Sequence, residues 1–165
     1  MDQCSLRRSA KLSPCGRYRY LLRRSWLDLF AQPDNYVLFI CLNPSTADAN
    51  IDDPTVRRCM GFARSWGYSG VVLANLFAFR ATDPKKMLSA PDPVGPDNDR
   101  YLVEAARVAS LVVAGWGVHG THKDRAREVR SLVPGLHYLR LTKGGHPAHP
   151  LFLPHYLRPI SWKNR

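Results

Sequence analysis

Four short apolar segments alternate with three helical patterns along this chain, and their order limits the possible folds more than any other feature. The apolar segments cover residues 36–42, 71–75, 111–115 and 136–141, and helical spacing covers residues 54–66, 98–110 and 122–133. Continuous apolar strands are typical of a parallel sheet that is buried on both faces. Strands that alternate with helices predict helices on both sides of that sheet. We therefore expect an α/β fold, a three-layer αβα sandwich around a central, mostly parallel four-stranded sheet.

The N-terminal region is expected to add an edge hairpin or arm to this sheet. Residues 17–26 alternate as a strand would, and their arginines fall on one face, which favours an edge position. Residues 1–16 are basic and are expected to form a flexible arm. A length of 165 residues suits one domain with its own hydrophobic core, so we expect a single domain over residues 1–165.

The charge of the chain is strongly positive. There are 24 Lys and Arg residues against 13 Asp and Glu residues, which gives a net charge of +11 and a pI of about 10.0. A compact basic domain attracts polyanions, and the arginine fork suits phosphate oxygens. We therefore expect DNA, duplex or single-stranded, as the partner of a monomeric protein. No apolar segment is long enough to span a bilayer and no secretion signal is visible, so we expect a cytoplasmic protein without a membrane partner.

The cysteines and histidines do not form a recognisable metal or cofactor motif. None of Cys4, Cys15, Cys41 and Cys59 forms a C-x-x-C pair, and the spacing gives little support to an iron–sulfur cluster. A disulfide framework is not expected in a chain with this core and no secretion signal. The spacing of the histidines in 146–149 resembles a metal-ligand pair, but no third ligand is obvious. We expect no metal and no cofactor.

Polar residues follow three of the apolar segments. Asn43-Pro44-Ser45-Thr46 follows the first, Asn75 ends the second, and residues 142–150, with His146, follow the fourth. In open α/β sheets, ligands bind beyond the carboxyl ends of the strands, so these loops are expected to converge on one site. An asparagine amide both donates and accepts, which reading a nucleobase edge requires. The alternative interpretation is that Asn75 caps a loop and that His146 is a surface histidine.

The order of these motifs resembles that of the uracil-DNA glycosylase superfamily, in particular its mismatch-specific thymine/uracil branch. The similar segments are C-L-N-P-S at 41–45, VVLANLFAFRATDP at 71–84, LVVAGWG at 111–117 and HPAHP at 146–150. The likeness extends over most of the chain and implies a uracil-DNA glycosylase-like fold. A closer resemblance is to a family of prokaryotic and phage proteins that share RYRY…W, NPSTAD, DDPTVRR, NLFAFRAT and GPDND in this order.

This resemblance implies a monofunctional DNA glycosylase, which flips a base out of the DNA and hydrolyses its N-glycosidic bond to leave an abasic site. The catalytic residues that it implies are Asn43, Asp48 and His146. The base-binding residues that it implies are Pro44, Ser45, Thr46, Asn75 and Phe77. The DNA-binding residues that it implies are Arg57, Arg58, Arg80, Lys143, His149, Leu151 and Phe152.

The chain departs from the superfamily pattern at two points. Some branches carry a water-activating Asp at the position of Asn43, so slower or more selective catalysis is expected, or a carboxylate from Asp48, Asp52 or Asp53. The uracil branch carries a Tyr that excludes 5-substituted pyrimidines, whereas only Pro44-Ser45-Thr46 follows here. A damaged or modified, 5-substituted pyrimidine is therefore expected, with hypermodified phage bases such as glucosylated hydroxymethylcytosine among the candidates. Two alternatives remain open: a non-catalytic nucleic-acid-binding module, and an enzyme that acts on free modified nucleotides.

Overall fold

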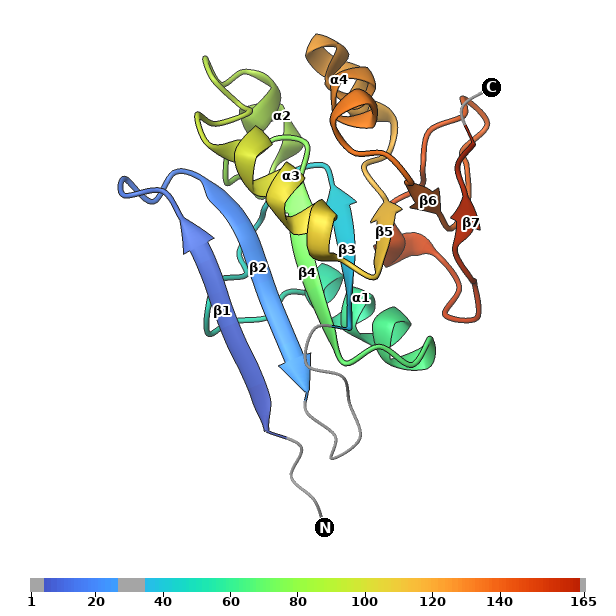
Figure 1. Cartoon of the computed structure of the whole chain (residues 1–165). Helices are drawn as coiled ribbons and strands as arrows, with labels where there is room; N and C mark the ends of the chain where they lie inside the picture. The colour runs from blue at the N-terminus through green and yellow to red at the C-terminus, as the bar shows by residue number, and fades with distance from the viewer. Residues whose placement is uncertain (1–4, 27–34, 164–165) are drawn as a thin grey trace.

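The computed structural model describes residues 5–26 and 35–163, and within them the strands form one sheet (Figure 1). The sheet has seven strands in the order β1-β2-β4-β3-β5-β6-β7 over these described residues. The strands are β1 (Leu6–Leu12), β2 (Arg19–Trp26), β3 (Tyr36–Cys41), β4 (Gly70–Asn75), β5 (Leu111–Ala114), β6 (His137–Tyr138) and β7 (Ile160–Ser161). The helices are α1 (Pro54–Ser65), α2 (Pro84–Leu88), α3 (Asn98–Val108) and α4 (Arg125–Leu132), with the 3₁₀ segments η1 (Val118–Asp124) and η2 (Pro150–Phe152).

The expectation of a four-stranded, mostly parallel sheet is wrong, because the sheet is larger and mixed. β4, β3, β5 and β6 pair in parallel, whereas β1 with β2, β2 with β4, and β6 with β7 pair antiparallel. The physical reason lies in the connections. A helical crossover returns the chain to the same end of the sheet and permits parallel pairing, whereas a short turn such as that between β1 and β2 permits only an antiparallel hairpin.

The N-terminal region forms the expected edge hairpin from β1 and β2, but it differs from the expectation in two details. β2 is not an edge strand, because it pairs with β1 on one side and β4 on the other. The flexible arm expected over residues 1–16 is replaced in Leu6–Leu12 by β1, which forms that edge of the sheet. The first four residues of the expected arm lie outside the described residues.

Helices cover both faces of the sheet, as Figure 1 shows for α1 and α3. The side chains of β3 alternate between the two faces. Val37, Phe39 and Cys41 pack with α1 on what we term the α1 face, whereas Leu38 and Ile40 pack with α3 and α4 on the α3 face. The apolar strands are thus buried on both sides, which confirms the prediction made from their uninterrupted composition.

The start of α1 lies where the sequence predicts it. Asp53 is the N-cap, and its carboxylate accepts a hydrogen bond of 2.9 Å from the backbone N–H of Val56, while Pro54 occupies the first turn. By contrast, the helix expected from residue 122 begins only at Arg125, because Lys123 and Asp124 adopt left-handed backbone angles. None of the helices in the described residues has the length and apolar character needed to cross a membrane.

Candidate functional site

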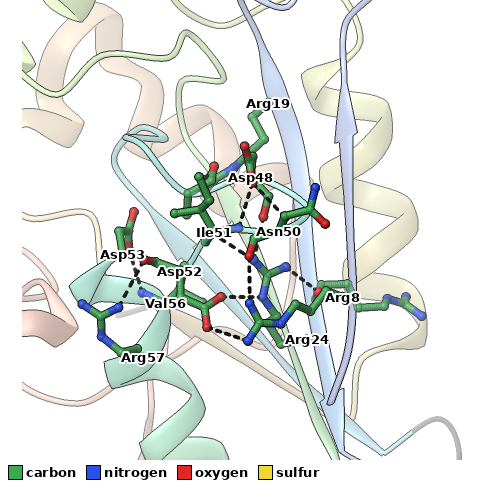
Figure 2. A network of polar contacts seen from close by, with 12 residues as sticks. Arg8, Arg19, Arg24, Asp48, Asn50, Ile51, Asp52, Asp53, Val56 and Arg57 are labelled. Carbon is green, nitrogen blue, oxygen red and sulfur yellow. Dashed lines mark hydrogen bonds and ion pairs between the residues drawn. The ribbon is translucent and has the colours of Figure 1, made fainter. Parts of the chain in front are cut away.

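The loop between β3 and α1, residues 42–53, leaves the carboxyl end of the parallel strands and is anchored by a buried arginine of β2 (Figure 2). Nε of Arg24 donates to Oδ1 of Asp52 at 2.7 Å, and its Nη2 donates to the carbonyls of Asp48 at 2.6 Å and Ile51 at 3.2 Å. Arg24 is completely buried. We refer to this segment as the β3–α1 loop, and these bonds fix its position over the sheet.

Asp48, one of the residues expected to be catalytic, holds the turn of this loop. Its Oδ1 accepts hydrogen bonds of 2.8 Å from the backbone N–H groups of both Asn50 and Ile51. These two bonds are the main reason that the pKa of Asp48 lies below its usual value. A carboxylate with a lowered pKa that is engaged in a turn is a weak base, so the geometry favours a structural role for Asp48.

Two asparagine side chains lie at the ends of adjacent parallel strands. Asn43 is half-buried, and its Nδ2 donates to the carbonyls of Ala81 at 2.9 Å and Pro44 at 3.2 Å. Both amide hydrogens therefore face protein acceptors, and Oδ1 remains to accept a hydrogen bond.

Asn75 differs from Asn43 in its burial and in its hydrogen bonds. It is only 2% exposed, and its Nδ2 has no hydrogen-bond partner among the described residues. Asn75 is the register partner of Cys41, whose side chain lies on the α1 face, so alternation places Asn75 on the same face. Buried amide groups are almost always bonded, and an unpartnered one at this edge marks a position at which a ligand can bond.

His149 lies next to a segment that packs against the end of β5. η2, which His149 caps, packs against the end of β5, since a Cβ placed on Gly115 would lie 2.7 Å from Cδ of Pro150. Nδ1 of His149 accepts a 3.2 Å bond from the N–H of Leu151, so the neutral ring carries its proton on Nε2. Burial lowers the pKa of His149, and Asp53 opposes that effect.

His146 belongs to an exposed turn. Its backbone N–H donates to Oγ1 of Thr142 at 3.2 Å, and Lys143 lies exposed in the same turn. The geometry thus favours His149, which the sequence placed among the DNA contacts, as the histidine of the site.

The remaining residues expected to bind the base differ in how deeply they are buried. Pro44 is buried, Ser45 is half-buried and Thr46 is exposed. Phe77 is fully buried in the core of the α3 face, with its ring 5.6 Å from that of His122. Phe77 therefore lies on the opposite face of the sheet from Asn75.

The residues expected to bind DNA divide into exposed and engaged side chains. Arg57 is exposed on the first turn of α1, where its Nη1 donates to the carbonyl of Asp52 at 3.2 Å, and Phe152 is 82% exposed on η2 beside the half-buried Leu151. Arg58 donates to the carbonyl of Leu153 and so ties α1 to η2. Arg80 donates to the carbonyl of Gly16 at 3.3 Å.

Arg19, at the start of β2, was not predicted as a site residue from the sequence. It is 3% exposed, and its Nη1 donates to the carbonyl of Ala47 in the β3–α1 loop at 2.8 Å. In the sequence it is one of several arginines in an alternating strand, and no local signal separates the buried ones from the exposed Arg23. No group of three metal-binding side chains occurs among the residues that the structure describes.

The fold is a mixed α/β sheet that carries two asparagines, Asn43 and Asn75, at the carboxyl ends of adjacent parallel strands. The chain belongs to the DUF1643 family, described as proteins of unknown function, whose model matches residues 19–151. The match begins at Arg19 and ends just after His149, so it includes Asn43, Asn75 and the β3–α1 loop. Neither the curated proteins nor the solved structures gave a match.

Proposed function

We propose that this protein is a cytoplasmic, monofunctional DNA glycosylase that excises a modified pyrimidine. The observation that carries the proposal is the buried amide of Asn75, whose Nδ2 has no partner in the described residues. An unmade hydrogen bond at a buried group costs about 1–3 kcal/mol, which a ligand acceptor would recover. The carbonyl oxygen of a pyrimidine flipped out of the DNA is such an acceptor.

The neighbouring groups support hydrolysis. Oδ1 of Asn43 is left to accept a hydrogen bond from water, since its Nδ2 is engaged by protein carbonyls. In the proposed reaction the water oxygen bonds to C1′ of the sugar, and the N-glycosidic bond breaks with its electron pair leaving on the base. Nε2–H of neutral His149 would donate to the oxygen on which that charge develops. The water proton passes to solvent, and the departing base is reprotonated there.

The resemblance of C-L-N-P-S and the later motifs to the uracil-DNA glycosylase superfamily supports this chemistry independently of the site geometry. The small residues after Asn43 favour a 5-substituted base. The net charge of +11 favours polymeric DNA over a free nucleotide as the partner.

Replacement of Asn75 by Ala tests the proposal. We expect single-turnover release of the base from oligonucleotides with candidate 5-substituted pyrimidines to slow by about 10- to 100-fold, because the amide bonds the base that departs. Asn50→Ala is the matched control, since Asn50 is exposed and only its backbone makes bonds in the loop. Equal rates for wild type and Asn75→Ala would contradict the role of Asn75.

The binding-module alternative makes a distinct prediction. If wild type produces no abasic site from any duplex or single strand while it still binds DNA in a salt-dependent manner, the glycosylase proposal is wrong and the binding module is favoured.

A further inference from the structure

Three arginine side chains are almost completely buried, and they differ in their partners. Arg24 is 0%, Arg125 is 1% and Arg19 is 3% exposed. Arg24 pairs with Asp52 at 2.7 Å, and Arg125 pairs with Asp99 at 2.5 Å. Among the described residues, no carboxylate lies within ion-pair distance of Arg19. A buried charge without a counter-ion is costly, so Arg19 requires a separate explanation.

The hydrogen bonds of Arg19 are also incomplete. A guanidinium has five N–H donors, of which Nη1 bonds to the carbonyl of Ala47, while the buried Nε has no partner in the described residues. Burial lowers the pKa of Arg19 to about 10, so the side chain is still protonated at neutral pH. Asp53 partly opposes the effect of burial, but its carboxylate already caps α1 through the N–H of Val56.

The surroundings of Arg19 are suited to an anion. The positive charges of Arg80 and Arg24 lower the pKa of Arg19 further, whereas the carboxylate of Asp53 opposes that effect. The twelve-residue helix α1 follows the β3–α1 loop that Arg19 contacts, and its N-terminus is the positive end of a helix dipole. Arginine binds phosphate through two parallel hydrogen bonds, which would use donors that the protein leaves free.

We propose that Arg19 binds a phosphate group of the nucleotide whose base enters the site, so that the site recognises a nucleotide and not a free base or nucleoside. This inference deepens the proposed function, because it adds the phosphate to what the same site binds. It differs from the general attraction of a basic surface for DNA, since Arg19 is buried and acts at one phosphate.

Calorimetric titration of the full chain with thymidine and with thymidine 5′-monophosphate tests the inference. Thymidine is the probe because its 5-methyl group represents a 5-substituted pyrimidine. Wild type is expected to bind the monophosphate at least about tenfold more tightly than the nucleoside, and Arg19→Gln is expected to bind both equally. Arg107→Gln removes an exposed charge from α3, on the opposite face, and should retain the wild-type ratio.

Equal affinities in wild type, no measurable binding of the monophosphate, or an unchanged ratio in Arg19→Gln would each overturn the inference. If Arg19→Gln does not fold, Arg19→Lys keeps the charge and a donor for Ala47 but lacks the fork, and it should reduce the ratio several-fold. The result of this titration can be distinguished from the result of the base-release assay. Phosphate-dependent binding without an abasic site would leave Arg19 as proposed and refute the glycosylase, and base release without phosphate discrimination would do the reverse.

Discussion

At the scale of single residues, His149 is the site residue whose protonation depends most directly on the fold. Its pKa is lowered from the ordinary 6.5 by burial, against the opposing charge of Asp53. Between that lowered value and 6.5, the unfolded chain binds a proton that the folded chain does not bind. The stability contributed by neutral His149 is therefore present above about pH 6.5 and is lost as the pH falls through the folded pKa.

This linkage predicts that His149→Asn makes stability less dependent on pH. The free energy of unfolding in urea, measured between about pH 8 and pH 5, should fall less steeply with acidification in the variant than in wild type. Asn retains a cap for η2, so the comparison isolates the titration. Identical slopes in wild type and His149→Asn would refute the prediction.

The two histidines, His146 and His149, show which features of single residues the sequence predicts and which depend on the fold. The H-P-A-H-P segment predicts a histidine near the site, but the side chain that packs at the end of β5 is decided by η2, whose contact with Gly115 joins residues distant in sequence. The burial of Arg19 and of Arg24 was likewise not predictable from the sequence. Buried and exposed arginines look alike in β2 until its neighbouring strands are known.

At the scale of elements, the β3–α1 loop depends on β2, because Arg24 bonds to three of its residues. Arg24→Ala would leave Asp52 with only its 3.5 Å ion pair to Arg8, and it would remove the side-chain donor from the carbonyls of Asp48 and Ile51. We expect the free energy of unfolding to fall by about 3 kcal/mol, the magnitude typical of breaking a buried ion pair. Urea denaturation checks this, with Arg7→Ala on exposed β1 expected to change stability by no more than about 0.5 kcal/mol. Similar values for the two variants would show that the anchor is unimportant.

The elements themselves were predicted better than their pairing. The apolar runs and the cap formed by Asp53 and Pro54 located β3, β4, β5 and α1 closely, because those signals are local. The antiparallel pairing of β2 with β4 was missed, because it depends on contacts between strands that the alternation of residues 17–26 does not specify. The short β6 was overestimated for the same reason, since only His137 and Tyr138 find partners.

At the scale of the whole molecule, the net charge of +11 should govern how DNA binding responds to salt. Each phosphate neutralised on duplex DNA contributes about −0.9 to the slope of log K against log salt concentration, so we expect a slope steeper than about −2. Arg57→Gln, at the exposed start of α1, should make this slope shallower by about 1. Arg107→Gln on α3 should leave it unchanged. Fluorescence anisotropy at several salt concentrations measures both, and a flat dependence in wild type would exclude phosphate contacts as the source of affinity.

The anchoring of the β3–α1 loop has a consequence for the thermodynamics of recognition. Arg24 holds the loop from β2, Asp48 closes its turn, and Asp53 joins it to α1, all through hydrogen bonds within the protein. Ordering a flexible backbone costs about 1–2 kcal/mol per residue, and a loop that is already held avoids that cost on binding. Ligand association should therefore proceed with a small conformational entropy penalty, and its heat-capacity change should reflect only the surface that meets the ligand.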